Sequence, residues 1–467
     1  MNKPNFVGLD TQYQTANGKL MRRIHMDGAA SPLASQIAFE TFQKALPHYS
    51  NTHSYVHSSA HISTEALDWA NKTTLDFVGA QPNDYAAIYN GSGSTAAINR
   101  VARGLSALRP EKKIVLVSAM EHHANDLPHR LHDNRVIYIP LTGEGKDQGS
   151  IDLAALEDLL KAHKDQVNYV AASHVSNVTG IINPIPEIAK LTHKYSALLV
   201  IDGAQAVAHM PIQLSQKDKN DETDFYIFSG HKLYAPSSPG VLIAKKKIIS
   251  KMTGQDLGGG SVSDVSYFDY QMQPQFPDRE QSGTPNILGA IALGAVMQQL
   301  QDYGREKIYQ HNQQLLSSLN KSLSKIDSIE IYGADNCQRV GAIALNHSEI
   351  DHGLLAAILN DYYAIAVRNE CFCAHPYVSS MLKESLWKLN LDNIPEDQQQ
   401  YYINRKRGMI RVSISLYNTQ SDINYLIESL NEITTNIADL KLQYEAQPDG
   451  SYKHKTYSLK WQDYLPI

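Results

Sequence analysis

The sequence predicts an α/β fold, in which a large domain with a mostly parallel sheet is joined to a smaller α+β domain. Between about residues 85 and 245, short apolar runs alternate with amphipathic helical patterns, as βαβ units require. Two of these runs lead into polar groups at Asp202 and Lys232, and a buried parallel strand delivers such side chains to a ligand at its carboxyl end. The chain of 467 residues is also long for one hydrophobic core, so two domains are expected.

The elements of the large domain follow from these patterns. Its strands are expected from five apolar runs, at residues 114–118, 136–140, 169–173, 198–202 and 225–229. Helices are expected where apolar residues recur with helical spacing, at residues 96–105, 151–160 and 185–194. A long helix is expected after Pro285, beginning at residue 287 and continuing beyond residue 300. Its Gly and Ala content indicates close packing against a neighbour.

The smaller domain follows this helix. It has strand-like runs at 340–345 and 409–414, flanked by helical patterns at 350–361 and 421–437. Alternation of strands and helices in so short a segment predicts a compact second unit.

Two further segments have no regular pattern. Residues 390–407 are polar, contain Pro395 and three consecutive glutamines, and are expected to form an exposed insertion. The tail after residue 437 has no clear periodicity until an aromatic end at 457–464. We therefore expect an N-terminal segment packed with the small domain, a large ligand-binding domain, a small domain and a C-terminal extension, at residues 1–30, 31–286, 287–436 and 437–467.

Composition excludes several classes of function. The chain is 42% hydrophobic and 19% charged, as is usual for soluble proteins. Its net charge of −6 and pI of about 6.3 give no electrostatic basis for binding nucleic acid or an anionic membrane. Three cysteines cannot build a disulfide framework and indicate a reducing compartment. The first residues lack the apolar core of a signal peptide, and no apolar run approaches a membrane span. We expect a cytoplasmic protein.

The residues at the two strand ends indicate a chemistry. Lys232 closes the run Phe225-Tyr-Ile-Phe-Ser-Gly-His-Lys232, and Asp202 closes the run that begins at Leu198, thirty positions earlier. A lysine in such a place can form a Schiff base with an aldehyde cofactor, and a nearby carboxylate can pair with a pyridinium nitrogen. Each residue alone would more simply cap a strand or a helix. Together they favour pyridoxal phosphate chemistry.

These motifs belong to a longer ordered series. From about Met26 to Asn418 the sequence resembles the class V aminotransferase family, and within it is most similar to the Suf-type, selenocysteine-lyase-like cysteine desulfurases. The matching segments include 26–30, 121–125, 174–180, 202–205, 229–232, 282–286, 368–376 and 411–418. The resemblance implies the type I, aspartate-aminotransferase-like fold, pyridoxal 5'-phosphate as the cofactor, and a homodimer with active sites at the subunit boundary.

The resemblance also implies roles around the cofactor. Lys232 would hold it covalently and later carry a proton between the substrate Cα and the ring. Asp202 would keep the ring nitrogen protonated, so that the ring can accept electrons. Gln205 matches the position that hydrogen-bonds the phenolic oxygen, His122 matches the histidine that stacks on the ring, and Asn177 matches a further ring contact. Without the resemblance, His122 would equally suit a surface loop.

A motif of small residues supplies donors for the phosphate. In Asn90-Gly-Ser-Gly-Ser-Thr95, backbone N–H groups can approach an anion, and the helix expected after it directs its N-terminus there. Such turns are common, and this one lacks the Gly-Lys-Thr of a P-loop. By the resemblance, the phosphate ligands would be Ser94, Thr95, Ser229, His231 and, from the other subunit, Thr284.

The resemblance also identifies residues for the substrate. Arg411 resembles the arginine that binds an α-carboxylate as a bidentate fork, which implies an amino-acid substrate, and Asn177 and His57 are further substrate-side candidates. Cys373 aligns with the nucleophile that attacks the substrate's sulfur and leaves as a persulfide, a task that suits a thiolate. A surface arginine and a buried structural cysteine are the simpler alternatives. With Lys232 and His122, Cys373 completes the expected catalytic set.

The sequence departs from the family in three places. Phe372 directly precedes Cys373, and Cys371 stands where the family often has histidine. The usual His-Arg-Gly-x-His segment becomes His57-Ser-Ser-Ala-His61, and about twenty extra residues separate Cys373 from Arg411. These changes bear on the sulfur acceptor and on substrate discrimination rather than on the cofactor site. Cys371 would be a resolving thiol or a spectator, and a metal site is disfavoured because no second ligand cluster is evident.

Three functions follow in order of preference. The first is a pyridoxal phosphate cysteine desulfurase that converts cysteine to alanine, loads a persulfide on Cys373 and passes the sulfur to an acceptor protein. The second is another class V enzyme, such as an aminotransferase, epimerase or C–S lyase, in which Cys373 is incidental. The third, a catalytically silent scaffold for sulfur carriers, is disfavoured by intact Lys232, Asp202 and Arg411. The sequence does not choose between cysteine and selenocysteine, and it does not name the acceptor.

Overall fold

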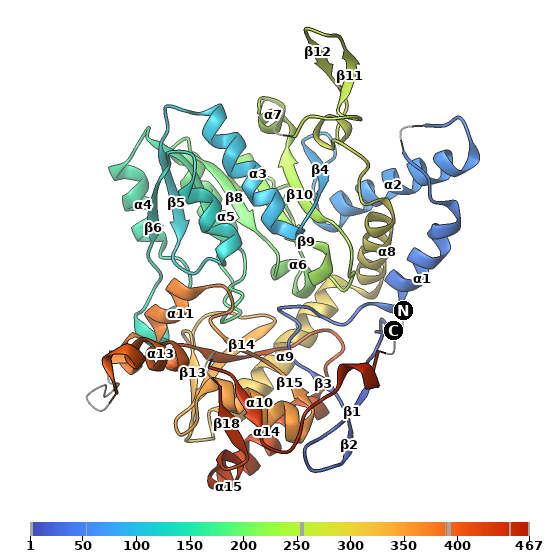
Figure 1. The fold of residues 1–467 in the computed structure, drawn as a ribbon. Helices are drawn as coiled ribbons and strands as arrows, with labels where there is room; N and C mark the ends of the chain where they lie inside the picture. Colours follow the sequence, from blue (N-terminus) through green and yellow to red (C-terminus); the bar gives the residue numbers. More distant parts are fainter. Residues whose placement is uncertain are drawn as a thin grey trace.

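The fold consists of a large and a small sheet, each covered by helices, with the N- and C-terminal segments side by side (Figure 1). The computed structural model describes residues 3–52, 54–252, 256–387, 389, 394–447 and 450–465. Within these ranges, no helix has both the length and the apolar character needed to cross a membrane.

The large sheet has seven strands and confirms the predicted α/β class. Their order across the sheet is β4 (Tyr85–Asn90), β10 (Gly240–Lys245), β9 (Phe225–Ser229), β8 (Leu198–Asp202), β7 (Val167–Ser173), β5 (Ile114–Ser118) and β6 (Arg135–Ile139). β10 runs antiparallel to both of its neighbours, while β9, β8, β7, β5 and β6 pair in parallel. Their carboxyl ends therefore meet at one edge, which is where a ligand site is expected in such sheets.

Alternating side chains of the central strands fill two separate cores. On β5, Leu116 belongs to one core, whereas Val115 and Val117 belong to the other, so both faces are covered and the strands are apolar except at their ends. The helices of this domain are α1 (Gln36–Ala45), α2 (Ser58–Phe77), α3 (Gly93–Leu108), α4 (Leu153–Ala162), α5 (Ile185–Lys194), α6 (Ala206–His209), α7 (Lys246–Ile249) and α8 (Ile287–Tyr303). The N-terminus of α3 lies at the ligand edge, directly after β4.

The small sheet is antiparallel and has four strands. In order these are β13 (Ile329–Tyr332), β14 (Ala342–His347), β17 (Met409–Ser413) and β16 (Arg368–Glu370). The helices α9 (Arg305–Leu323), α10 (His352–Tyr363) and α14 (Gln420–Thr435) enclose its core. At the N-terminus, β1 (Gln12–Gln14) pairs with β2 (Leu20–Arg22), and β3 (Ile24–His25) pairs in parallel with β15 (Ile365–Ala366). The segment before the large domain thus joins the small one.

Two segments that lacked a sequence pattern have regular structure. After α11 (His375–Met381) and α12 (Lys383–Trp387), the expected insertion forms the helix α13 (Glu396–Lys406), while residues 390–393 lie outside the described residues. The tail contains α15 (Ile437–Lys441) and a hairpin of β18 (Tyr444–Ala446) and β19 (Tyr452–His454). A third hairpin, β11 (Val262–Val265) with β12 (Tyr270–Met272), projects from the large domain (Figure 1).

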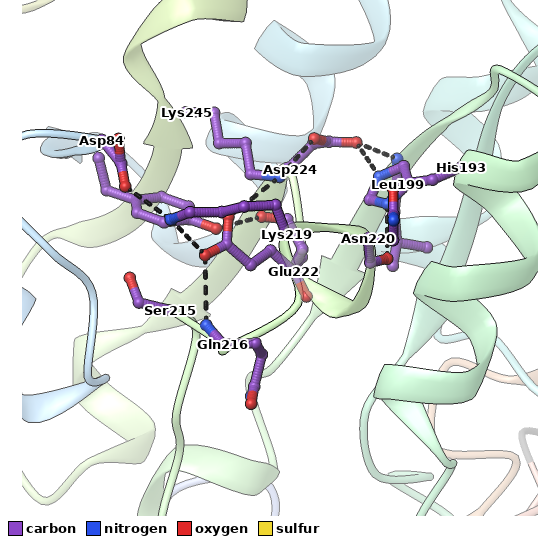
Figure 2. A network of polar contacts seen from close by, with 12 residues as sticks. Asp84, His193, Leu199, Ser215, Gln216, Lys219, Asn220, Glu222, Asp224 and Lys245 are labelled. Carbon is purple, nitrogen blue, oxygen red and sulfur yellow. Dashed lines mark hydrogen bonds and ion pairs between the residues drawn. The ribbon is translucent and has the colours of Figure 1, made fainter.

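A buried network of charges joins the strands at the edge opposite the ligand edge (Figure 2). The ammonium of Lys245, at the end of β10, lies 3.2 Å from Asp224 and 3.5 Å from Glu222. Asp224 also accepts a hydrogen bond from the Leu199 backbone, and its Oδ2 lies 2.9 Å from Nε2 of His193. The carboxylate of Glu222 is bound in addition by the exposed Lys219. Two buried carboxylates therefore share one buried lysine, in addition to the separate partner that each of them has.

Lys245→Met is expected to destabilise the fold strongly. The substitution leaves Asp224 and Glu222 buried without their shared cation, and breaking a buried ion pair costs about 3–5 kcal/mol. Lys219→Met is the matched control, because the Lys219 side chain is 64% exposed and water screens exposed pairs. Urea denaturation midpoints measure both effects. Equal shifts for the two variants would contradict a structural role for the buried cation.

Candidate active site

A cavity of about 290 Å³ lies where the ligand edge of the large sheet meets the small domain. It brings together most of the residues predicted from sequence. Those that line it are Ser94, Thr95, His122, Asn177, Asp202, Gln205, Ser229, His231, Lys232, Cys373 and Arg411. The strand-end positions explain this convergence, because β8 and β9 deliver their last residues to the same edge.

Lys232 ends a short 3-10 turn (Gly230–Lys232) directly after β9. Burial lowers the pKa of its ammonium; the Arg411 charge acts in the same direction, and Asp202 and Cys373 act in the opposite one. A lysine with a lowered pKa is more often the neutral amine, which is the form that attacks a carbonyl carbon. This side chain can therefore bind an aldehyde covalently.

Asp202 ends β8 and is 6% exposed. Its Oδ1 accepts a hydrogen bond of 2.9 Å from the Ala204 backbone, and no described residue donates to its Oδ2. Burial raises the pKa of this carboxyl, against the hydrogen bond and the charge of Lys232. A buried carboxylate with a free oxygen facing a cavity calls for a cationic donor. Next to it, the Gln205 amide donates to the Ala29 carbonyl at 2.8 Å, and its second N–H remains for a ligand.

His122 lies on the loop after β5 and faces the same cavity. Its Nδ1 accepts a hydrogen bond from the Ala124 backbone at 3.0 Å, so Nε2 carries the proton. Burial, together with the nearby charge of Lys232, lowers the pKa of the ring to about 3, and the imidazole is neutral at neutral pH. A neutral planar ring is suited to stacking on an aromatic ligand.

Glu121 holds the loop that carries His122 in place. Its buried carboxylate accepts hydrogen bonds from the Ser118 hydroxyl, from Asn125 at 2.6 Å, and from the Ser173 hydroxyl and backbone at 2.6 and 2.7 Å. Burial raises the pKa of Glu121 to about 7, although these donors act against the rise. The loop that carries His122 is thereby tied to β5 and to the end of β7.

The N-terminus of α3 lies against the turn that precedes Lys232, and together they offer donors that could hold an anion. The Ser94 backbone donates to Oγ of Ser229 at 2.8 Å, which joins the two segments. Gly93 has φ of +60°, and a Cβ built there would lie 2.8 Å from Oγ of Ser229, so only glycine fits. Thr95 and His231 complete the lining. Backbone N–H groups at a helix N-terminus, flanked by hydroxyls, bind phosphate.

Arg411, on β17, faces the cavity from the small domain and is 3% exposed. Its Nη1 donates to the Asn177 carbonyl at 3.0 Å, and its Nη2 lies 3.1 Å from Oδ1 of Asp27. Burial lowers the pKa of the guanidinium, while Asp27 raises it. The arginine is held in place without full neutralisation, as an anchor for a ligand carboxylate should be.

Cys373 is exposed to the cavity at the turn before α11. Its carbonyl accepts a hydrogen bond of 2.7 Å from the His123 backbone. The rings of His123 and His375 stack with centroids 4.9 Å apart, and Nε2 of His123 lies 3.1 Å from Nδ1 of His375. The loop that contains His123 and the loop that contains Cys373 and His375 (the cysteine loop) are thus held against each other.

Cys371 has a different environment from Cys373. Its side chain is 4% exposed, and the thiol donates to the Arg407 carbonyl at 3.3 Å. Burial raises the pKa of this thiol to about 11, so it is protonated at neutral pH and inert as a nucleophile. The contact joins the cysteine loop to the residue that follows α13.

Two predicted residues lie outside this cavity in the single chain. His57 is exposed at the start of α2, where its Nδ1 accepts a hydrogen bond from the Ala60 backbone at 3.3 Å. Thr284 is also exposed, and its hydroxyl donates to Asn51 at 3.4 Å. Neither residue is among those that line the cavity of its own chain.

Sequence reasoning gave no role to Asp27, Arg368 and Phe372, which the structure brings to the site. Arg368 and Phe372 line the cavity, and Asp27 pairs with Arg411. All three belong to segments that resembled the family, so a signal was present. Their roles depend on contacts between segments far apart in the chain, which single motifs do not contain.

The arrangement defines a ligand with three chemical features. An amine at Lys232 calls for an aldehyde, the carboxylate of Asp202 for a basic ring nitrogen, and the N-terminus of α3 for a phosphate. Pyridoxal phosphate has all three. The residues that line the cavity therefore fit this cofactor, and Arg411 and Cys373 remain for a substrate.

Comparison with known proteins agrees with this geometry. A family model described as Aminotransferase class-V matches residues 24–426, so the match ends before the C-terminal extension. A cysteine desulfurase of Shigella sonnei is 31% identical over 416 residues, which make up 88% of this chain and 93% of that protein. A cysteine desulfurase of Escherichia coli (strain K12 / DH10B) is 30% identical over equal shares.

Solved structures give the same result. The apo structure of the cysteine desulfurase from Thermococcus onnurineus NA1 superposes with a TM-score of 0.76 at 26% identity, over 89% of this chain and 95% of that one. A cysteine desulfurase from Escherichia coli superposes with a TM-score of 0.72 at 25% identity, over 88% and 95%. The similarity covers the large and the small domain together.

Proposed function

This chain belongs to the class V aminotransferase family, and from that premise we propose that it is a pyridoxal-phosphate-dependent cysteine desulfurase that converts L-cysteine to L-alanine. One observation carries the proposal. The same cavity is lined by an amine, a guanidinium that can bind a carboxylate, and a thiol, at Lys232, Arg411 and Cys373. An enzyme that only moves an amino group has no need of a thiol in that position. A desulfurase requires all three.

The residues of the large domain would hold the cofactor. Lys232 binds its aldehyde carbon, Asp202 pairs with its ring nitrogen, His122 stacks on the ring, and the N-terminus of α3 takes its phosphate. When bound, the cofactor supplies an electron sink for the carbanion that forms at the substrate Cα. Lys232 would move the proton at that carbon.

The small domain would place the substrate and receive its sulfur. Arg411 binds the α-carboxylate. The Cys373 thiolate attacks the substrate sulfur, so that an S–S bond forms and the C–S bond breaks with its electron pair left on carbon. That carbon takes up a proton, which gives alanine, and the sulfur remains on Cys373 as a persulfide. Because this product is reactive, an acceptor protein would remove it. A free thiol nucleophile suits a reducing compartment such as the cytoplasm.

A panel of amino acids tests the proposed reaction. The purified protein, loaded with pyridoxal phosphate, is incubated with cysteine, selenocysteine, homocysteine and aspartate, and the products are separated. We expect cysteine to yield alanine and, with a reductant, sulfide in equal amounts. Formation of pyruvate and ammonia from cysteine would instead identify a C–S lyase, and amino transfer from aspartate would identify an aminotransferase.

Arg411→Ala is expected to weaken the grip on the substrate carboxylate. Loss of a buried charge-assisted pair costs about 2–4 kcal/mol, or roughly thirty- to a thousandfold in kcat/KM. Steady-state kinetics with cysteine measure the change. Arg279→Ala is the control, because that arginine lies outside the cavity lining. Unaltered kcat/KM in Arg411→Ala would contradict the anchor.

We also propose that the protein is a homodimer. Thr284 would reach the phosphate in the site of the partner subunit, since it is exposed and does not line the cavity of its own chain. It contacts Asn51, in a segment whose apolar side chains are open to solvent, including Leu46, Tyr49, Tyr55 and Val56. A surface of this kind is usually covered by a partner.

Val56→Asp is expected to weaken this dimer, because Val56 is 93% exposed in the single chain and a second copy would bury it. Light scattering reports the mass of the assembly. Leu442→Asp, which alters an exposed residue of the C-terminal extension, is expected to leave the mass unchanged. A wild-type protein that is monomeric and fully active would contradict the shared site.

A further inference from the structure

Phe372, directly before the nucleophile, has an unusual backbone conformation. Its φ is +51°, and those of Glu370 and Cys373 are +83° and +54°. Residues other than glycine rarely adopt this region, and a bulky side chain there is a clear outlier. Such conformations persist only where the surroundings enforce them, and they concentrate at functional sites.

Contacts on both sides of the residue hold it in place. The Phe372 carbonyl accepts a hydrogen bond of 2.8 Å from the Asn177 amide. The Phe372 ring lies under the Arg411 guanidinium, with its centroid 4.9 Å from Cζ. Arg411 itself donates to the backbone carbonyl of Asn177. Each of the three residues therefore contacts the other two. Phe372 as a whole is 7% exposed and lines the cavity.

The contacts do not use every hydrogen-bond donor of the arginine. Nη1 is bound to Asn177 and Nη2 to Asp27, whereas Nε of Arg411 is buried and has no hydrogen-bond partner among the described residues. The aromatic ring covers part of the guanidinium surface. An aromatic face next to a guanidinium excludes water and attracts the cation, with an effect of about 0.5–2 kcal/mol.

We propose that Phe372 is a positioning residue that orients Arg411 for the substrate carboxylate and ties this anchor to Cys373 through the adjoining peptide bond. The proposal rests on the function proposed above. It also gives a reason for the left-handed backbone: the conformation lets two successive residues serve different parts of one substrate, since Phe372 packs on the carboxylate anchor and Cys373 presents its thiol. The position that departs from the family thus acquires a role.

Two substitutions separate an aromatic effect from simple bulk. Phe372→Leu keeps an apolar side chain but removes the aromatic face, whereas Phe372→Tyr keeps the face. Binding of L-alanine, the proposed product, and of L-alaninamide, which lacks the carboxylate, is measured by calorimetry on the loaded protein. We expect Phe372→Leu to weaken L-alanine binding about 2- to 30-fold, to leave the amide unchanged, and to raise KM for cysteine. Phe372→Tyr should remain within about twofold of wild type.

Several outcomes would overturn this role. Wild-type affinity for L-alanine in Phe372→Leu would show that the ring does not orient Arg411. Equal losses in the Leu and Tyr variants, or equal losses for L-alanine and its amide, would indicate general disruption of the loop instead. The binding assay does not depend on sulfur transfer. If the wild type bound L-alanine but formed no persulfide, the desulfurase function would fail while the role of Phe372 would still be tested.

Discussion

Lys232→Ala is expected to reduce turnover of cysteine by at least about a thousandfold, because no other amine among the described residues lines the cavity to bind the cofactor aldehyde and move the substrate proton. The effect should extend to the cofactor itself. Reduction with borohydride should attach pyridoxal phosphate to the peptide that contains Lys232 in the wild type, and to no peptide in the variant. Mass spectrometry of the digested proteins makes the comparison.

The control for this prediction is Lys251→Ala, which removes an exposed lysine that does not line the cavity. It should retain wild-type activity and covalent cofactor. Cofactor still attached to the Lys232→Ala protein by borohydride would show that a different lysine is the attachment site. The cofactor would then not be bound at the ligand edge of the large sheet.

Cys373→Ser is expected to abolish sulfide release while sparing cofactor and substrate binding. The cysteine sulfur is attacked by the Cys373 thiolate, and a hydroxyl is a far weaker nucleophile at neutral pH. A fall of at least about a thousandfold in alanine formation is expected. Calorimetry should still detect binding of L-alanine, because Arg411 and Lys232 are unchanged.

The two other cysteines provide matched controls. Cys371→Ser should retain the first persulfide-forming turnover, since the Cys371 thiol is buried and hydrogen-bonded to the Arg407 carbonyl. Cys337→Ser, which alters a residue outside the cavity lining, should behave as wild type. Full activity in Cys373→Ser would favour a class V enzyme in which that cysteine is incidental.

The strands of the large domain could be predicted because they are buried on both faces. The runs at 114–118, 198–202 and 225–229 are apolar up to a polar last residue, and the structure assigns strands over the same residues. The helix expected from residue 151 begins instead at Leu153, because Asp152 caps it by accepting hydrogen bonds from the Ala154 and Ala155 backbones. Local chemistry was sufficient for these elements, apart from the exact boundary.

Other elements could not be predicted because they are determined by distant parts of the chain. The hairpin of β18 and β19 has little apolar alternation of its own, and it is held by contacts such as that between His454 and the Tyr362 hydroxyl at 2.9 Å. The antiparallel direction of β10 is likewise a property of the sheet and not of its apolar sequence. Amino-acid composition and periodicity indicate neither the contacts of the hairpin nor the direction of β10.

The same distinction applies to the site. Lys232 and Asp202 could be identified because each ends an apolar run, where side chains reach a ligand. The pairing of Asp27 with Arg411 joins residues 384 positions apart, and the different environments of Cys371 and Cys373 depend on the course of one short loop. Such relations require the folded chain.

Mass spectrometry of the protein after one equivalent of cysteine tests whether Cys373 receives the substrate's sulfur. The loaded wild-type protein is mixed with cysteine, its thiols are trapped by alkylation, and the extra sulfur is assigned to a residue by fragmentation. We expect one additional sulfur atom on Cys373 and an equal amount of alanine. Additional sulfur on Cys371, or alanine formed without sulfur on either cysteine, would contradict it.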